Sequence, residues 1–584
     1  MTDLDTTDRR GAERLLLRSA WHARGWLAAA GATAVVLAVL ETALPGVLGR
    51  AVDSVIGRAG DVWIVAAALV VTALAGADAL DDLAVGMATA QSTAWLRRGL
   101  LRHFVRAGMA ASKRIAPGDF AGRMVSNSTY AGRAGTDIVR AAANVLPAAG
   151  AFIALALIDP WLLLVVAAGM PLLFVVLRAF LRDSSGLASR YFAIQGAIAG
   201  RLGDALGGAR TIAASRTEDR ETERVLAELP DLHREGLGMW HAQGRIAVQQ
   251  GLLMPLLEVA VLALAGVELA HGRISPGEML AAAQYAVLAT SLLSTLPALT
   301  RLVRARAGAQ RVDEVLREPE VRYGATAVPD GPGSIEFRDV TVHAGDRAVI
   351  DELSLTIDGG SLTAIVGRSG AGKSLFAALA GRLFDPDSGT VLFDGADMRT
   401  LPHDELRTLI GYAFERPSLF GATIEDAVAF GVTRPSPGAV TEAARRADAD
   451  DFVRRLPEGY ANRLAATPMS GGETQRIGLA RAFAHPGRVL ILDDVAASLD
   501  TVTEYRIASV LTTALAHRTR IVVAHRAATA ARADTVVWLE GGRVRAVAPH
   551  AVLWHNLGYR AIFDPGALTP GPNGNGHKPT LDAG

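Results

Sequence analysis

Apolar residues are concentrated in the first half of the chain, in six long runs. The runs occupy residues 26–46, 62–77, 141–158, 161–176, 246–270 and 279–299. A helix needs about 20 apolar residues to cross the hydrocarbon core of a bilayer. The second and fourth runs are slightly short, but their flanks can extend them as helix. The pattern therefore predicts six membrane-spanning helices.

The connections between the runs differ in length and charge. Asp159-Pro160 joins the third run to the fourth, which predicts a tight hairpin, and residues 271–277 form a short turn between the last two. Arginine is frequent in residues 1–24, 97–133 and 178–224. With six spans these three stretches lie on one side of the membrane, and their arginines make that side cytoplasmic. A soluble all-α domain with buried helices is the alternative, but such domains rarely combine six apolar runs with this arginine asymmetry.

Two further features of this half bear on the membrane. Leucines at 15–17, flanked by arginines and followed by Trp21, predict an amphipathic helix at the membrane surface. Glu41 and Glu258 fall inside predicted spans, where ionisable groups are costly and tend to face a cavity. They are candidates for a substrate path. Alternatively, Glu41 lies near the outer interface and Glu258 faces a neighbouring helix.

The composition agrees with a membrane protein and excludes several chemistries. Half of the 584 residues are hydrophobic and 20% are charged. Formal net charge is zero, so the chain has no bulk attraction for nucleic acid. The chain has no cysteine, which excludes disulfides, thiolate zinc sites and iron–sulfur clusters.

From about Ser334 the pattern changes to short strands alternating with helices, which indicates an α/β domain. Residues 311–333, which contain several glycines and prolines, are the predicted linker to it. Residues 566–584 are rich in Pro, Gly and Asn and are predicted to be disordered.

A glycine-rich turn follows the apolar run 362–366 and predicts a phosphate-binding loop. Backbone N–H groups at such a helix N-terminus form a positive concavity for phosphate. Lysine would reach the outer phosphates, and the serine hydroxyl would hold Mg²⁺. The candidate nucleotide-binding residues are Gly367, Arg368, Ser369, Gly370, Ala371, Gly372, Lys373, Ser374 and Leu375.

Four more motifs follow in order. The stretch 411–415 ends in Glu415, and Met469 is followed by Ser470, Gly471, Gly472 and Glu473. An apolar run at 489–492 leads into Asp493 and Asp494. Residues 498–500 read Ser-Leu-Asp, and the apolar run 521–524 ends at His525.

The order and spacing of these motifs resemble the nucleotide-binding domain of an ABC transporter. With the six apolar runs, about residues 12–565 are similar to a half-transporter of the exporter fold. The resemblance implies an all-α transmembrane domain of six helices with long cytosolic extensions, followed by an α/β P-loop nucleotide-binding domain. The expected boundaries are 1–25 for the N-terminal helix, 26–310 for the transmembrane domain and 334–565 for the nucleotide-binding domain. The implied location is the cytoplasmic membrane, with the second domain in the cytosol.

The resemblance also implies cofactors and residue roles. ATP and Mg²⁺ are the expected cofactors, with Ser374, Glu415 and Asp493 at the metal. Asp494 is at the position of the catalytic base, and His525 is the switch residue that contacts the γ-phosphate. The remaining candidates are Ser470, Gly471, Gly472 and Glu473, which would clasp a nucleotide bound to a partner domain.

This sequence departs from the family pattern at several positions. The base is usually glutamate, and Asp494 is one methylene shorter; a shifted backbone could still let it act as base. Glu415 replaces a glutamine. The aromatic ring that stacks on adenine is missing near residues 342–344, where His343 is the nearest substitute, and residues 460–468 lack the family's glycine-glutamate element.

The departures suggest a heterodimer. This chain would bind ATP in a slow site and complete the active site of a second half-transporter that carries the glutamate. Residues 117–123 and 207–211 are the candidate segments that couple the domains, although each could be a simple turn between long helices. The leading function is export of a small or peptide-like molecule across the bilayer. The alternatives are import of an iron-siderophore and an ATP-binding regulatory subunit that gates a partner.

Overall fold

The computed structural model describes residues 2–57, 60–291, 295–345, 347–496 and 499–564. The chain divides into two compact units. The helical unit comprises Met1–Val105 and Ile115–Glu318, and the sheet unit comprises Arg106–Arg114 and Pro319–Gly584. The sequence places the end of the membrane domain at residue 310, whereas the helical unit continues to Glu318. The predicted disordered tail, 566–584, lies outside the described residues.

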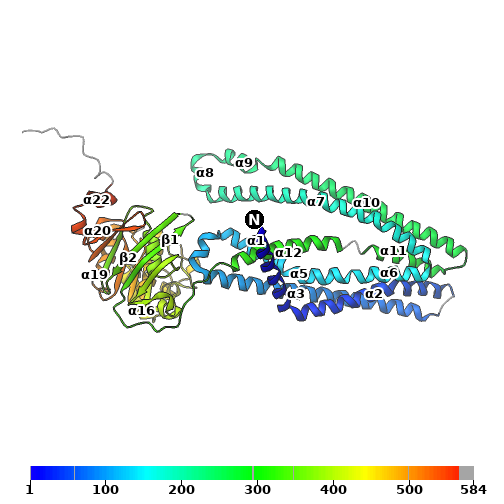
Figure 1. Ribbon diagram of the computed structural model, residues 1–584, viewed down its shortest axis with the longest axis horizontal. Coiled ribbons are helices and arrows are strands. Elements are labelled where there is room, and N and C mark those ends of the chain that lie inside the picture. The colour runs from blue at the N-terminus through cyan, green and yellow to red at the C-terminus, as the bar shows by residue number, and fades with distance from the viewer. Residues whose placement is uncertain (1, 58–59, 292–294, 346, 497–498, 565–584) are drawn as a thin grey trace, which may run out of the picture. The chain divides into compact units, whose positions relative to one another are not determined.

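Long helices make up the helical unit (Figure 1). They are α1 (Thr2–His22), α2 (Arg24–Val55), α3 (Val62–Arg114), α4 (Pro117–Gly122), the π-helix η1 (Arg123–Asn127), α5 (Ser128–Ala143), α6 (Val145–Ile158), α7 (Pro160–Gly207), α8 (Ala209–Ser215), α9 (Glu218–Leu226), α10 (Leu229–Ala270), α11 (Pro276–Ala289) and α12 (Thr295–Leu316). The last turns of α3, from Arg106, belong to the sheet unit.

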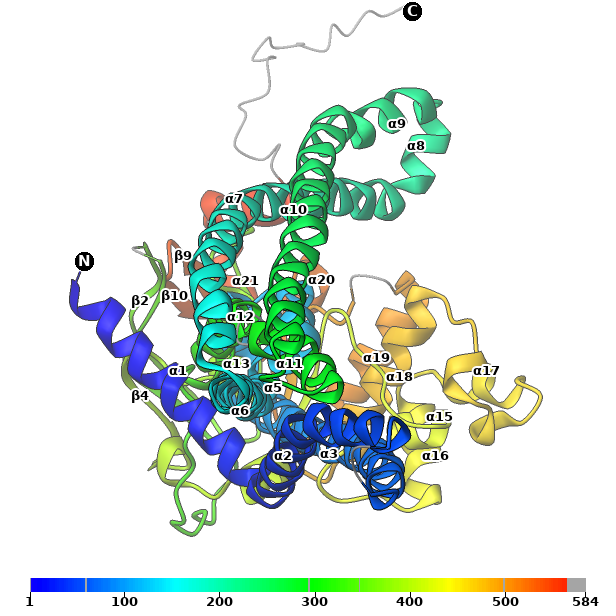
Figure 2. The same cartoon turned by 90° about the vertical axis from the view of Figure 1, so that its right-hand side faces the viewer.

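Local sequence signals set several of the helix ends. The Asp159 side chain accepts a hydrogen bond from Trp161 N at 2.7 Å, and Pro160 occupies the first position of α7. This confirms the predicted tight turn between the third and fourth runs. Helices α7 and α10 then run side by side, and α8 and α9 join their far ends (Figure 2).

Three helical stretches in the described residues are long and apolar enough to span a membrane: Arg24–Val55, Val62–Gly108 and Pro117–Ile158. They contain the first three predicted runs. A shorter apolar stretch, Pro160–Pro171, holds the start of the fourth run. The fifth run lies in α10, and the sixth is divided between α11 and α12 by residues 292–294, which are not described. The count of six spans stays a prediction.

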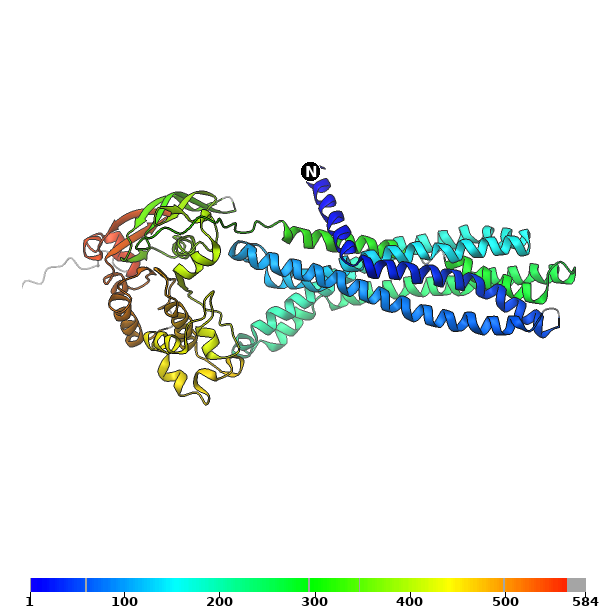
Figure 3. The same cartoon turned by 90° about the horizontal axis from the view of Figure 1, so that it is seen from below.

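The amphipathic helix predicted at the N-terminus is α1, and it crosses the long axes of the other helices (Figure 3). Ala12 and Leu15 are buried in a cluster that includes Val312 of α12. Leu17 and Trp21 are 70% and 69% exposed. Because Leu15 packs on protein, the apolar face that α1 can offer to the membrane is narrower than the sequence suggests.

Asp81 is an acid that the helical unit buries, and it is not one of the two acids predicted inside the membrane. Glu41 is exposed on α2 and Glu258 is half-buried on α10, and their place in a substrate path stays a prediction. Asp81 of α3, by contrast, is 5% exposed. Its carboxylate accepts hydrogen bonds from Thr33 Oγ1 at 2.9 Å and from Arg140 Nη2 at 2.8 Å. A buried carboxylate of this kind is retained only with such partners.

The candidate coupling segments adopt defined local structures. Residues 117–122 form α4, and Gly208 separates α7 from α8 within residues 207–211. Arg123, at the end of α4, has a side chain that is 11% exposed. It binds Asp119 at 2.8 Å and Glu314 of α12 at 2.8 Å. Segment 117–123 is thus held against α12, and its coupling role stays a prediction.

Two sheets form the frame of the sheet unit. The antiparallel sheet has the order β2-β1-β4-β5, and the other, which is largely parallel, has the order β10-β9-β3-β8-β7-β6. The strands are β1 (Ile335–Ala344), β2 (Arg347–Ile357), β3 (Leu362–Val366), β4 (Ser388–Phe393), β5 (Ala396–Asp397), β6 (Ile410–Ala413), β7 (Val489–Leu492), β8 (Thr519–Val523), β9 (Thr535–Glu540) and β10 (Arg543–Ala548).

Short helices connect and cover these strands. They are α13 (Lys373–Ala380), α14 (His403–Leu409), α15 (Ile424–Val428), α16 (Pro437–Arg446), α17 (Asp450–Arg454), α18 (Gly471–Ala484), α19 (Thr501–Thr512), α20 (Ala527–Ala530), α21 (His550–Leu553) and α22 (Leu557–Phe563), with 3-10 turns η3 (Met398–Thr400), η4 (Gly459–Ala461) and η5 (Leu464–Ala466). The structure confirms the predicted fold class, a helical unit followed by an α/β unit.

The parallel strands gather the predicted motifs at one edge of their sheet. β3, β7 and β8 are buried along their whole length, as their apolar sequences predict. β6, β7, β8 and β3 run in the same direction, so their carboxyl ends lie together. Ligands of such sheets bind at this edge.

One close backbone contact in the helical unit generates a stability prediction. A Cβ on Gly277, in the first turn of α11, would lie 2.0 Å from the Gly49 carbonyl oxygen of α2. Asp53 of α2 also accepts a hydrogen bond from Gly277 N at 2.9 Å. We expect Gly277→Ala to destabilise the protein by about 1–3 kcal/mol, because the two backbones must separate. The measurement is the thermal unfolding midpoint in detergent.

The matched control is Gly86→Ala on α3, where a Cβ would meet no atom within 4 Å. Its midpoint should be unchanged or slightly higher, since alanine favours helix. If Gly277→Ala unfolds at the wild-type temperature, the contact does not limit the packing of α2 against α11.

Candidate nucleotide site

The glycine-rich turn between β3 and α13 has a backbone that only glycine tolerates well. Gly370 and Gly372 have φ values of 79° and 92°. A Cβ on Gly367 would lie 2.4 Å from the carbonyl oxygen of Leu539 on the neighbouring strand β9. The turn is thus packed tightly against the sheet, and the N-terminal N–H groups of α13 face outward from it. This is a concavity of the kind that holds phosphate.

The other residues of the turn divide between core and surface. Ala371 is buried in the core cluster beside β1 and β2, and Leu375 is half-buried against the same cluster. Arg368, Ser369 and Ser374 are exposed. The structure therefore places Ala371 in a packing role and leaves the polar members of the predicted set accessible.

Lys373, the first residue of α13, is only 6% exposed. Its Nζ donates hydrogen bonds to the carbonyl oxygens of Gly367 at 2.8 Å and Arg368 at 3.1 Å. Burial lowers the pKa of Lys373, while the nearby carboxylates Asp493 and Asp494 act in the opposite direction. A compact ammonium with several donors fits this narrow position.

Asp493 follows β7 and is 9% exposed. It accepts hydrogen bonds from Ser374 Oγ at 3.0 Å and from the Tyr412 hydroxyl. Burial raises the pKa of Asp493, and the negative charges of Glu415 and Asp494 raise it further. Asp493 and Asp494 act on Lys373, and Glu415 lies close enough to act on both aspartates. This excess of negative charge favours a bound cation.

The residues present fit MgATP. The described residues contain no group of three or more His, Asp or Glu side chains arranged to hold a metal by themselves. Mg²⁺ ordinarily takes one or two protein oxygens and completes its shell with phosphate and water. Ser374 and Asp493 are already 3.0 Å apart and could supply those oxygens. Glu415, whose side chain is 49% exposed, lies near enough to act on Asp493 electrostatically.

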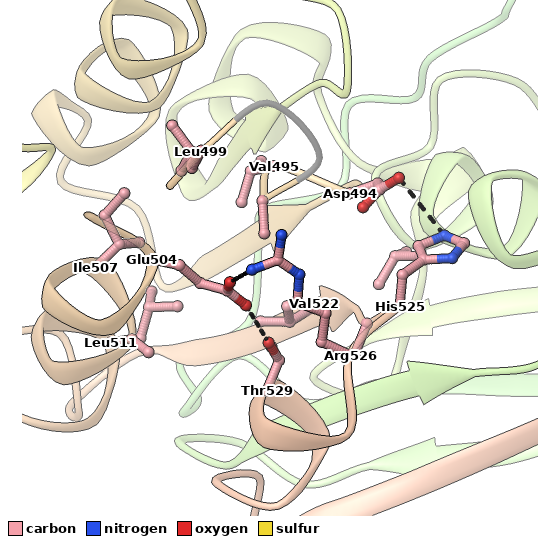
Figure 4. Close-up of a pocket in the computed structure, with 14 residues that line it drawn as sticks. Asp494, Val495, Leu499, Glu504, Ile507, Leu511, Val522, His525, Arg526 and Thr529 are labelled. Atoms are coloured by element: carbon pink, nitrogen blue, oxygen red, sulfur yellow. Dashed lines mark hydrogen bonds and ion pairs between the residues drawn. The ribbon is translucent and has the colours of Figure 1, made fainter. Parts of the chain in front are cut away.

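Asp494 has an unusual backbone conformation, with φ of 48°. Its Oδ2 lies 3.6 Å from Nε2 of His525, which follows β8 through Ala524 (Figure 4). Burial raises the pKa of Asp494, whereas His525 lowers it. The structure thus brings the two predicted catalytic residues together, with the carboxylate directed at the imidazole.

Gln475 is a connecting residue that the sequence analysis did not identify. It lies on α18, is 2% exposed, and its side-chain amide donates to the carbonyl oxygens of Glu415 at 3.2 Å and Asp494 at 3.3 Å. One buried amide therefore joins the segments that follow β6 and β7. A glutamine two residues after the signature motif gives little indication of this role in the sequence, because the carbonyl groups that it binds are distant along the chain.

The signature residues form the N-terminus of α18. Ser470 is the N-cap, and Glu473 N donates to its Oγ at 3.3 Å. The Glu473 carboxylate accepts from Ser470 N and Ser470 Oγ, each at 2.8 Å, and these bonds lower the pKa of Glu473. Gly471 is exposed and Gly472 half-buried, so the start of α18 is accessible from outside the domain.

His343 does not point to the phosphate-binding turn. It is on the exposed face of β1, where its N and Nδ1 lie 2.7 Å and 3.3 Å from Asp387 Oδ2. Its neighbour Val342 occupies the opposite face, in the core cluster with Ala371. The predicted contact of His343 with adenine stays a prediction.

The predicted dimer-contact loop is described in part. Ser498 lies outside the described residues. Asp500 caps α19 by accepting hydrogen bonds from Val502 N and Thr503 N, each at 2.9 Å. Four residues after Asp500, Glu504 binds Arg526 and Thr529, which follow His525 in the sequence (Figure 4).

A phosphate-binding turn, a buried acid after β7 and a capped signature helix define a P-loop nucleotide-binding domain. Family models agree and add the membrane half: "ABC transporter" matches residues 350–497, and "ABC transporter transmembrane region" matches residues 27–293.

Similar proteins give the same result. The ABC transporter ATP-binding protein RamA of Streptomyces coelicolor is 44% identical over 535 residues, which cover 91% of this chain and 84% of that protein. The mycobactin import ATP-binding/permease protein IrtB of Mycolicibacterium smegmatis is 35% identical over 57% of this chain and 61% of that protein. The solved structure of a bacterial Atm1-family ABC exporter with ATP bound has a TM-score of 0.74, with 24% identity, and covers 94% of this chain and 99% of that one.

The chain therefore belongs to the ABC transporters. It is an ATP-driven half-transporter of the exporter fold, with a membrane-spanning region and a cytosolic nucleotide-binding domain. The solved structure, at 24% identity, supports the fold alone.

The bridging amide gives a prediction for the site. Gln475→Glu keeps the shape of the side chain but replaces the donor by a carboxylate, which leaves two buried carbonyl oxygens without their partner. An unmet buried group costs about 1–3 kcal/mol. We expect ATP turnover of the assembled transporter to fall about tenfold, because the segments carrying Glu415 and Asp494 lose their connection.

Thr474→Ala is the matched control, since within the described residues the Thr474 hydroxyl donates to the carbonyl oxygen of Ser470, the N-cap of the same helix. It should keep turnover within about twofold. Unchanged turnover in Gln475→Glu would show that the two segments hold their positions without the amide.

Proposed function

We propose that this chain is the catalytically weak subunit of a heterodimeric exporter. Two nucleotide-binding domains would enclose two ATP molecules, each between the phosphate loop of one chain and the signature of the other. The partner would be a second half-transporter with glutamate at the position of Asp494. The heterodimer would carry a small or peptide-like molecule across the bilayer.

The position of Asp494 is the observation that supports this proposal. An aspartate is shorter than the usual glutamate by one methylene, and here its carboxylate is turned towards His525 at 3.6 Å. A displacement of about 1 Å in a reacting group can cost roughly 100-fold in rate. The left-handed backbone at Asp494 and the hydrogen bond from Gln475 to its carbonyl oxygen restrict any shift that would restore the reach.

The residues that bind nucleotide are a separate set. The N–H groups of the turn from Gly367 to Gly372 and the ammonium of Lys373 would hold the phosphates. Ser374, Asp493 and Glu415 would hold Mg²⁺, which supplies charge neutralisation at the outer phosphates. None of these roles requires Asp494, so the site keeps its affinity while it loses water activation.

The signature is the part that this chain contributes to the partner's site. Ser470 and the glycines after it are intact, and the capping bonds with Glu473 fix the start of α18. In the proposed heterodimer this helix start faces the partner's ATP, where positive helix ends stabilise phosphate charge.

The proposal predicts how turnover depends on Asp494. The full-length chain alone should hydrolyse ATP very slowly, and the pair should hydrolyse it at the rate set by the partner's site. Asp494→Glu should raise the turnover of this chain's own site by up to about 100-fold, because the carboxylate regains its reach. The measurement is phosphate release from the pair in nanodiscs, with the site of this chain and the site of the partner inactivated in turn.

Asp494→Asn is the control for a residual base. If the wild-type carboxylate does not activate water, Asp494→Asn keeps the same slow rate. Brisk ATP hydrolysis by the chain alone, abolished in Asp494→Asn, would contradict the proposal.

Import is a second candidate, because the similar protein IrtB is named as a mycobactin importer. Vesicles that contain the pair separate the two directions. An exporter accumulates substrate inside inverted vesicles when ATP is added outside, whereas an importer, whose nucleotide-binding domains also face outward there, moves a ferric siderophore from the lumen to the medium.

A further inference from the structure

Helix α19 is connected to the signature helix through one residue, Asp448, whose carboxylate binds α19 and whose carbonyl oxygen binds α18. The Asp448 backbone lies in the left-handed region, with φ of 57°, in the turn after α16. Arg476 of α18 donates to the Asp448 carbonyl oxygen at 3.0 Å. Thr503 and Arg506 of α19 donate to its two carboxylate oxygens at 3.2 Å and 2.9 Å. The side chains of Asp448 and Arg476 are each only 21% exposed, so this link is largely shielded from water.

A second carboxylate connects the same helix to the segment after the switch histidine. Glu504 of α19 has a side chain that is 14% exposed. Its Oε1 accepts a hydrogen bond from Thr529 at 2.8 Å, and its Oε2 pairs with Arg526 (Figure 4). Arg526 is the residue next to His525. The carboxylate therefore fixes both ends of the short segment that leads from His525 into α20.

These two links use neighbouring residues of α19, Thr503 and Glu504. The first turn of that helix is itself fixed, because Asp500 caps it with two hydrogen bonds of 2.9 Å. Bonds to ionised groups are stronger than neutral ones, and partial burial strengthens them further. A continuous set of such bonds thus runs from α18 through Asp448, α19 and Glu504 to Arg526.

We propose that Asp448 and Glu504 are positioning residues that connect this chain's switch loop to its signature helix. ATP at the chain's own slow site would be contacted by His525, which would hold the switch loop in place. Through Glu504, α19 and Asp448, the held loop fixes α18, whose N-terminus completes the partner's catalytic site. Nucleotide that is not hydrolysed here thereby supports hydrolysis in the partner. This inference rests on the proposed heterodimer.

The test is a double-mutant cycle in the assembled, full-length pair. Glu504→Gln and Asp448→Asn each remove one charge with little change of shape. Each should lower the maximal ATP turnover of the partner's site by between about twofold and 30-fold. The double variant should be no slower than the slower single variant, because both changes interrupt one connection. The KM for ATP should stay within about twofold, as should the affinity of this chain for fluorescent MgATP.

Two further variants make the result specific. Glu540→Gln removes the carboxylate paired with Arg545 across the β9–β10 turn, a partly exposed pair remote in sequence from α19, and should leave turnover unchanged. Thr529→Val removes one of the two bonds to Glu504 and should give a smaller loss than Glu504→Gln. It also keeps the link testable if Glu504→Gln is poorly folded.

Additive losses in the double variant would overturn the inference, because they indicate two independent structural effects. A loss of MgATP affinity equal to the loss of turnover would also overturn it, since the residues would then support binding only. The result is separable from the heterodimer proposal. If the chain alone hydrolyses ATP briskly and Asp494→Asn abolishes this, the heterodimer proposal fails. The same double-mutant cycle can then be run on the chain alone. Non-additive losses there would still show that Asp448 and Glu504 act through one connection.

Discussion

The chemistry of the sheet unit depends on one electrostatic constraint, the crowding of Asp493, Asp494 and Glu415 at the edge of the parallel sheet. Lys373 is the buried cation that faces Asp493 and Asp494, and its ammonium is hydrogen-bonded to backbone carbonyl oxygens. Burial strengthens repulsion between like charges, so the arrangement is stable only with proton sharing, local hydrogen bonds or an added cation. The Ser374, Tyr412 and His525 contacts meet part of this requirement. A divalent cation would meet the rest, which would explain why a concentration of acids lies at a site that fits MgATP.

The fold creates this crowding because parallel strands end at the same edge. β6, β7 and β8 deliver Glu415, the two aspartates and His525 from segments far apart in sequence. The buried strands cannot move independently, so a change in side-chain length is not absorbed by the backbone. Asp494 shows the consequence. Its carbonyl oxygen accepts a hydrogen bond from Gln475, and its carboxylate lies 3.6 Å from the His525 imidazole.

Much of this could be predicted from sequence, and the remainder depends on long-range contacts. The glycine-rich turn and the apolar runs are local patterns, so the fold class and the position of the phosphate loop followed from them. Gln475 could not be found, because its partners are backbone carbonyl oxygens 60 and 19 positions away. His343 is a candidate only because it is the ring nearest in sequence to the expected adenine-stacking position. The alternation of side chains along β1 places it on the exposed face, next to Asp387. The burial of Leu15 on α12 and of Asp81 beside Arg140 likewise requires the packed helices.

If different residues bind the nucleotide and activate water, affinity and rate can change independently. In the proposed site the amides of the turn and Lys373 would hold the phosphates in the ground state as well as in the transition state, so they would contribute to affinity as well as to rate. Asp494 could affect rate without affecting affinity. On this proposal, a substitution at that one position would turn a hydrolytic site into one that only holds nucleotide, while the nucleotide would still stabilise the closed pair of domains. In the proposed heterodimer such a site would be useful only if its occupancy reaches the partner. Helix α19 lies on that route, because Thr503 and Arg506 bind Asp448, which bonds in turn to Arg476 of the signature helix, and Glu504 binds Arg526 after His525.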